Sequence, residues 1–208
     1  MNKIKPIRIR AAFAKATARF FLNGLGINQF PINAIKIVQK LAQLYYFSDD
    51  TEEGFTTYHP AEGYKVYINI YLPDGRINWT YTHELAHIVL KHFQTYDCNS
   101  LNDQELSILD REANIFVREF LMPEKLVRMY AIPPVSVPAL GNLKEKFDVS
   151  WEAMINRLDE LGIQNKAMTH KMLAEWRQSK TLEISNPKYD DFMKAIREML
   201  DFVDNFKW

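Results

Sequence analysis

The sequence predicts an α+β fold in which many helices accompany one small sheet. Apolar residues recur at helical spacing in several segments, whereas residues 64–72 alternate strictly between apolar and polar side chains. Residues 131–141 contain three prolines and have the character of a linker. These observations divide the chain into a domain over residues 1–130, a short helical region over 142–163 and a helical segment over 164–208.

Helices are expected wherever the apolar period is near 3.6 residues. The segment 1–24 is basic, has no acidic residue and predicts an amphipathic helix that packs through the apolar stripe of Ile9, Ala12, Phe13, Ala16 and Phe20. Contact of its basic residues with nucleic acid or an acidic partner is the alternative. The further predicted helices cover 31–44, 102–122, 142–147, 151–161 and 189–206. Residues 48–63 are rich in acidic side chains and are predicted to form a solvated loop.

The overall composition excludes several classes of protein. Lys plus Arg and Asp plus Glu both number 26, so the chain is not a globally basic nucleic-acid binder. Cys98 is the only cysteine, which rules out an internal disulfide and leaves His and carboxylates as metal ligands. The sequence contains neither a signal-peptide core nor a transmembrane span, and a cytoplasmic location is therefore expected.

The segment His83-Glu84-Leu85-Ala86-His87 carries the most specific chemical signal. His83 and His87 are four residues apart, so on a helix they share one face and can bind one ion. Neutral imidazole nitrogens suit zinc. Glu84 lies about 100° around the helix from His83 and can take a proton from a metal-bound water. The motif therefore predicts a zinc hydrolase with Glu84 as its general base.

A catalytic zinc needs a third protein ligand, which must come from another element. Leu90 and Phe93 occupy the positions where a metzincin has its glycine and third histidine. His92 is excluded because it would point about 180° from His83 on a continuous helix. The helix predicted downstream offers four carboxylates: Glu105, Asp110, Glu112 and Glu119. All but Asp110 flank its apolar stripe on the same side, so geometry alone leaves the choice open.

Two segments resemble the ImmA/IrrE family of metallo-endopeptidases. The first runs from Trp79 to His87, with Trp79 where the family commonly has Phe; the second runs from Asp110 to Phe116 and leads to Leu121-Met122-Pro123. The resemblance implies a zincin-like domain that binds Zn²⁺ through His83, His87 and Glu112. It also implies that the substrate is a protein, namely a DNA-binding repressor of a prophage, mobile element or stress response.

The likeness extends to residues 143–162, which resemble the family's small helix-turn-helix-like region. Residues 143–163 carry three basic and five acidic side chains, and Arg157 is the one basic residue of the helix predicted over 151–161. This charge disfavours DNA binding and favours recognition of a protein. The main alternative function is a non-proteolytic regulator that binds a repressor and uses zinc structurally. The presence of Glu84 favours the enzyme, because a purely structural site has no need of a base.

Overall fold

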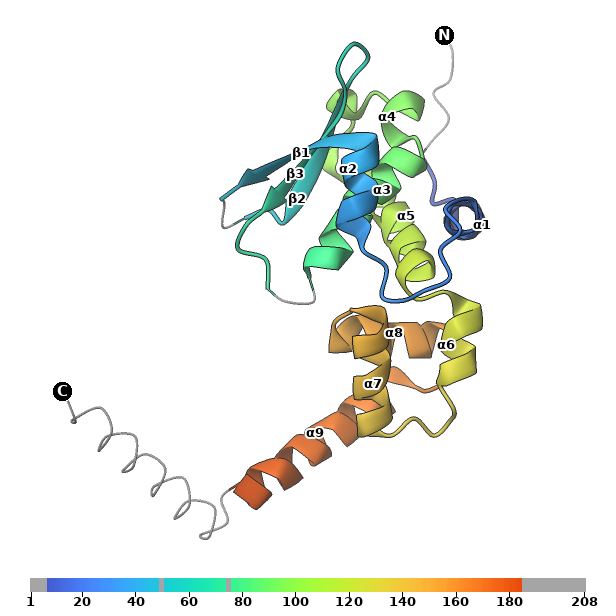
Figure 1. Cartoon of the computed structure of the whole chain (residues 1–208), viewed down its shortest axis with the longest axis vertical. Helices are drawn as coiled ribbons and strands as arrows, with labels where there is room; N and C mark the ends of the chain where they lie inside the picture. Colours follow the sequence, from blue (N-terminus) through green and yellow to red (C-terminus); the bar gives the residue numbers. More distant parts are fainter. Residues whose placement is uncertain (1–6, 49–50, 74–75, 185–208) are drawn as a thin grey trace, which may run out of the picture. The chain divides into compact units, whose positions relative to one another are not determined.

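Three strands form a mixed sheet in the order β1-β3-β2 (Figure 1). The computed structural model describes residues 7–48, 51–73 and 76–184. The strands are β1 (Ala42–Phe47), β2 (Gly54–His59) and β3 (Gly63–Asn69). β1 runs parallel to β3 with Leu44 opposite Val66, and β2 runs antiparallel to β3 with Thr56 opposite Val66. Val66 is fully buried at the centre of the sheet.

The strand predicted over 64–72 is therefore present, although it ends at Asn69, and Ile70 beyond it is 56% exposed. The other two strands correct the prediction. β1 lies where the end of a helix over 31–44 was expected, and β2 lies in the predicted loop over 48–63. Both are edge strands with few buried side chains, so their sequences lack the strong apolar alternation of β3.

Helices cover the sheet and build the core in successive layers. Their bounds are α1 (Ala11–Gly24), α2 (Ala34–Leu41), α3 (Ile77–Val89), α4 (His92–Thr95), α5 (Asp103–Leu121) and α6 (Glu124–Tyr130), with a 3₁₀ turn at Cys98–Ser100. α3 contacts β2 and β3 on one side and α5 on the other, and α1 packs against α5 (Figure 1). This arrangement confirms a helix-rich α+β fold with a small sheet.

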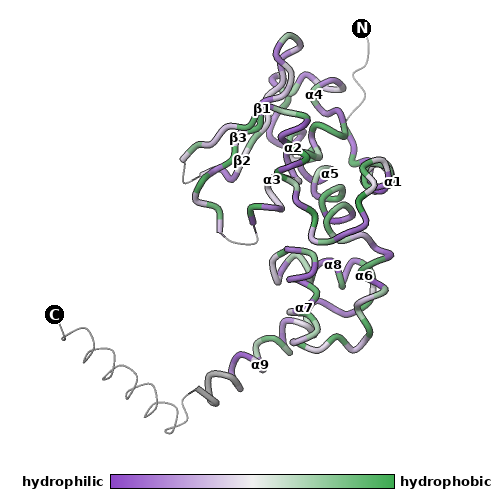
Figure 2. The backbone as a smooth tube through the Cα atoms, viewed as in Figure 1, coloured by the Kyte–Doolittle hydropathy of each residue, from purple (hydrophilic) through white to green (hydrophobic). Residues whose placement is uncertain are grey.

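The core lies on the two sides of α5, against α1 and against α3. Leu85 of α3, together with Phe116 and Phe120 of α5, has no exposed surface, and the two phenylalanine rings stack with centroids 5.4 Å apart. Figure 2 shows these helices as tubes on which apolar and polar residues alternate. Small residues of α1, Ala14 and Ala18, are buried and let that helix approach α5 closely. The predicted helix is therefore present, but the predicted packing stripe is wrong. Ile9, Phe13 and Phe20 are 40%, 46% and 79% exposed, and the buried face of α1 is that of Ala14, Ala18 and Leu22.

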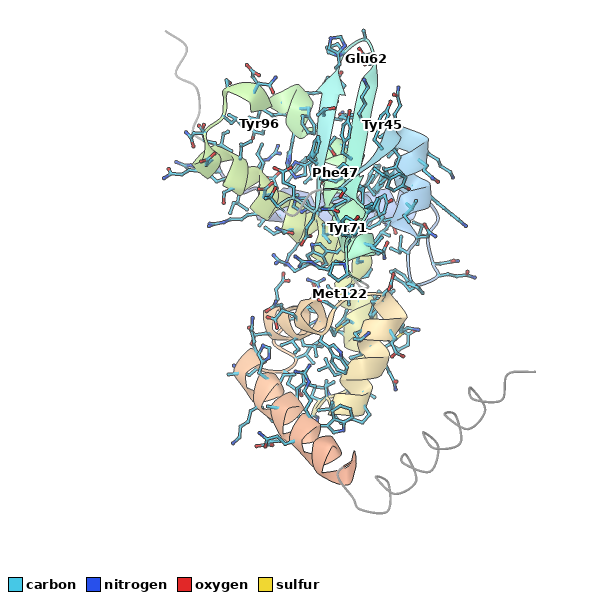
Figure 3. All side chains as sticks on the ribbon, turned by 90° about the vertical axis from the view of Figure 1, so that its left-hand side faces the viewer. Tyr45, Phe47, Glu62, Tyr71, Tyr96 and Met122 are labelled. Carbon is cyan, nitrogen blue, oxygen red and sulfur yellow. The ribbon has the colours of Figure 1, made fainter. Side chains whose placement is uncertain are left out.

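The helix-turn-helix-like region consists of α7 (Val137–Phe147) and α8 (Trp151–Glu160). Arg157 of α8 is fully buried; its Nη2 donates to Glu119 Oε2 at 2.6 Å and its Nε to the Met122 carbonyl at 3.0 Å. Met122 lies just beyond the end of α5, before α6 begins (Figure 3). The buried ion pair therefore joins α8 to α5.

The chain divides into two units, one ending at Gln164 and the other beginning at Asn165. The predicted domain over 1–130 and the region 142–163 both fall in the first unit. The described part of the second unit contains α9 (Lys166–Ile184), which lies within the helical segment predicted over 164–208, although no individual helix was predicted at these residues. The helix predicted over 189–206 lies outside the described residues. None of the described helices combines the length and apolar character needed to cross a membrane.

Replacing Gly54 with alanine should lower the free energy of unfolding by about 1–3 kcal/mol, as overpacking does elsewhere. A Cβ atom at Gly54 would lie 2.9 Å from the Tyr67 carbonyl oxygen and 3.0 Å from Thr80 Cγ2, so β2 would have to move. Urea denaturation measures the change. Gly24→Ala is the matched control, because a Cβ there meets nothing within 4 Å. Equal stabilities of the two variants would contradict the tight packing of β2.

Candidate metal centre

Two histidines of α3 and one aspartate of α5 converge at the site. His83 Nε2 lies 3.8 Å from Asp110 Oδ1, His87 Nε2 lies 3.5 Å from the same oxygen, and the two Nε2 atoms are 3.1 Å apart. The three residues form a group whose candidate ligand atoms lie within 4.8 Å of one another. Ligands of a tetrahedral zinc, at bond lengths of about 2.0–2.2 Å, are roughly 3.3 Å apart. The donor set and its spacing therefore fit zinc.

The prediction that Glu112 completes this set is not supported by the geometry. Glu112 Oε2 accepts hydrogen bonds from the backbone N and Nε of Arg10 at 2.8 and 3.1 Å, and Oε1 accepts from Arg10 Nη2 at 2.5 Å. Positions 110 and 112 are about 200° apart on a helix, so they cannot face the same neighbour. Asp110 faces α3, whereas Glu112 is buried and bonded to the first residue before α1. Asp110 thus replaces Glu112 as the candidate third ligand.

The four carboxylates left open by the sequence have four different partners in the structure. Glu105 belongs to a capping box with Asn102 at the start of α5. Glu119 is bonded to Arg19 and Arg157. Glu112 is bonded to Arg10, and Asp110 alone joins the two histidines. The side of the helix shared by Glu105, Glu112 and Glu119 is therefore occupied by structural contacts.

Glu84 lies beside the three candidate ligands but is not one of them. Its side chain is only 5% exposed, and its Oε2 accepts a hydrogen bond from Thr56 Oγ1 at 2.7 Å. Thr56 belongs to β2, so the edge strand holds the carboxylate in one orientation. Burial raises the pKa of Glu84 above its usual range. The sequence did not single out Thr56, because its strand was taken for a loop.

The charge states of the site follow from burial and from the mutual contacts. Burial lowers the pKa of His87 to about 4, so this candidate ligand is neutral at pH 7, as metal binding requires. Burial acts to lower the pKa of His83 as well. The hydrogen bond to Asp110 and the negative charges of Glu84 and Asp110 outweigh burial, so the pKa of His83 is raised. Burial acts to raise the pKa of Asp110, but its hydrogen bonds to His83 and His87 outweigh burial and lower the pKa below its usual range. The carboxyl is therefore ionised.

Each histidine also has a partner behind the site. His83 Nδ1 lies 3.3 Å from Asn114 Oδ1, one turn after Asp110 on α5. His87 Nδ1 lies 3.0 Å from His92 Nδ1. His92 was excluded as a ligand on the assumption that α3 continues through it. In the structure α3 ends at Val89, and Lys91 has a left-handed backbone with φ 59°, which turns His92 back towards His87.

The site opens into a cleft of about 690 Å³ between β2, α3 and α5. Its lining includes Thr56 of β2, the predicted motif residues of α3, and Trp79, which precedes that motif by one turn. A cleft of this size admits a segment of a larger ligand. The arrangement can therefore bring a polypeptide next to the two histidines, Asp110 and Glu84.

Comparison with known proteins agrees with this geometry. A family model described as peptidase M78, IrrE N-terminal-like domain, matches residues 29–159. A solved structure of a Mycobacterium tuberculosis transcriptional regulator is similar to 71% of this chain, with a TM-score of 0.52 and 16% identity. This chain spans 46% of that protein, and at this identity the likeness concerns the fold alone. No curated protein gives a significant match.

Proposed function

Because this chain belongs to the peptidase M78 family, as its two sequence motifs predicted, we propose that it is a zinc-dependent endopeptidase. The observation that carries the proposal is the convergence of His83, His87 and Asp110 beside the buried carboxylate of Glu84. In this proposal the first three residues bind the metal and Glu84 is the general base. When bound, zinc supplies a Lewis acid that makes water more acidic and polarises a peptide carbonyl.

The role of Glu84 follows from its contacts. Thr56 donates to Oε2, which orients the carboxylate and leaves Oε1 to accept the proton of an attacking water. The raised pKa makes Glu84 a better proton acceptor than an exposed glutamate. The same group can then deliver that proton to the amine that leaves when the peptide bond breaks.

An extended substrate would be aligned by β2. β3 cannot do so, because it lies between two other strands and has no free edge. The Asn69 N–H donates to the Glu53 carbonyl, so these two residues form a hydrogen-bonded pair of the antiparallel β2–β3 ladder. Hydrogen-bonded and non-hydrogen-bonded pairs alternate along such a ladder, so the backbone N–H and C=O groups of Gly54, Thr56 and Tyr58 point away from β3. These groups face the free edge beside the cleft, where an extended segment can add as a strand.

We propose that the substrate is a DNA-binding repressor, on the basis of the family. The charges support recognition of a protein over DNA. Arg157, the one basic residue of α8, is fully buried against Glu119, and no phosphate can reach it. Arg10, Lys15 and Arg19 near the N-terminus are paired with acidic residues of α5 and α8. Their charges are therefore neutralised within the protein.

The test is incubation of the purified zinc-loaded protein with the helix-turn-helix repressor encoded beside its gene. We expect discrete repressor fragments in mass spectra, their disappearance when a zinc chelator is added, and their return when zinc is restored. Tight binding of an intact repressor would support the alternative, a non-proteolytic regulator. Fragments that persist in the presence of chelator would mean that the proposed centre does not perform the cleavage.

A further inference from the structure

A buried chain of side chains extends from His87 into the protein. His92 Nδ1 lies 3.0 Å from His87 Nδ1, and His92 Nε2 lies 3.4 Å from Glu112 Oε1. His92 has no exposed surface and Glu112 is 1% exposed. The three residues come from α3, α4 and α5, so this series of contacts forms only in the folded protein.

Arg10 fixes the state of Glu112. Its backbone N and Nε donate to Oε2, and its Nη2 donates to Oε1, so both carboxylate oxygens are bonded to a group that is always a donor and always charged. The opposite charges of this pair cancel, although only Glu112 is buried and the Arg10 side chain is 34% exposed. Glu112 is thus held as a carboxylate, which accepts hydrogen bonds and cannot donate them.

An acceptor at one end sets the direction of every hydrogen bond along the chain. Since Glu112 can only accept, His92 Nε2 must carry a proton and donate to it. A neutral imidazole with a proton on Nε2 has a lone pair on Nδ1, so His92 Nδ1 accepts from His87 Nδ1. His87 then carries its proton on Nδ1, and its Nε2 lone pair faces Asp110 and His83.

We propose that Glu112 and His92 are positioning residues that hold His87 in the one tautomer able to bind a metal through Nε2. The inference rests on the proposed metal centre and assigns Glu112 a role in it other than that of ligand. A doubly protonated His92 would donate at both nitrogens and turn His87 the other way.

His83 has a different kind of support. Its Nδ1 is bonded to the side-chain oxygen of Asn114, and an amide offers both a donor and an acceptor. An amide can rotate to suit either tautomer of its histidine, whereas the Glu112 carboxylate permits only one direction. The two ligands of α3 should therefore differ in how strictly their tautomers are set.

The first experiment uses the metal-free full-length protein with ¹⁵N-labelled histidine. Long-range ¹H–¹⁵N spectra distinguish which ring nitrogen carries the proton, and His92→Phe and His87→Gln assign the signals. We expect wild-type His87 to be protonated at Nδ1 and His92 at Nε2, before any metal is added. A His87 that carries its proton on Nε2, or a doubly protonated His92, would overturn the inference. The measurement is made on the wild-type protein, and the two variants serve only to assign its signals.

The second experiment measures zinc affinity by competition with a chromophoric chelator. Glu112→Gln and His92→Phe should each bind zinc about 10–100-fold more weakly than wild type, the usual effect of losing an outer partner of a ligand. Glu119→Gln is the matched control: Glu119 is another buried, arginine-bonded glutamate of α5, but it does not contact His92. Its zinc affinity should equal that of wild type.

The outcomes separate the two proposals. If wild type binds zinc while both variants bind it equally well, the positioning role is wrong and the metal centre stands. If all three substitutions weaken zinc binding alike, the effect is general destabilisation, and the positioning role is again wrong. If wild type binds no zinc, the proposed function itself fails, whichever tautomer His87 adopts.

Discussion

Glu84→Gln should leave zinc bound and lower the turnover of repressor cleavage by about 10²- to 10⁴-fold, the contribution typical of a general base. Glutamine has nearly the same shape, and its side-chain oxygen can still accept the hydrogen bond from Thr56. It cannot take a proton from water, however. The rate of fragment formation under single-turnover conditions measures the effect.

The control for this variant is its metal content and thermal stability, which should match those of wild type because Glu84 is not a ligand. Loss of zinc from Glu84→Gln would mean that the carboxylate contacts the metal. Cleavage at the wild-type rate would remove Glu84 from the mechanism altogether.

Asp110→Ala should weaken zinc binding by more than the roughly 100-fold that loss of an outer partner costs, because a direct ligand is lost. The side chain of Asp110 is 56% exposed, so its removal leaves no cavity in the core. The metal-free variant should therefore unfold at the wild-type temperature. Chelator competition gives the affinity, and a thermal melt gives the control.

The comparison with Glu112→Gln decides between the two candidate third ligands. If Asp110 binds the metal, Asp110→Ala loses far more affinity than Glu112→Gln does. The opposite order would restore Glu112, the residue implied by the family resemblance, as the ligand. The difference is large because one change removes a bond to zinc, whereas the other reaches the metal centre only through the contact of Glu112 with His92, which lies behind His87.

Some features of this protein are local, and the sequence alone was sufficient to predict them. The pair His83 and His87 shares a face because four residues make about one helical turn, whatever the surroundings. β3 was predicted because its buried face imposes a strict alternation. The buried stripe of α5, with Leu109, Ala113, Phe116 and Phe120, likewise repeats at helical spacing.

The edge strands and the site's contacts depended on elements distant in sequence. β1 and β2 exist because each pairs with β3, and the pairing satisfies backbone groups without requiring an apolar sequence. Thr56 reaches Glu84 only because β2 lies beside α3. His92 reaches His87 because the chain reverses at Lys91, for which the helical period offered no signal.

The choice between Asp110 and Glu112 shows most clearly where sequence reasoning ends. Both are carboxylates on one helix, and their spacing implies only that they face different neighbours. The packing of α1 on one side of α5 and of α3 on the other places Arg10 against Glu112 and the histidine pair against Asp110. The sequence by itself predicted the helix of the candidate metal centre and its proposed base. The candidate third ligand was decided by tertiary structure, because it depends on which helix packs against each side of α5.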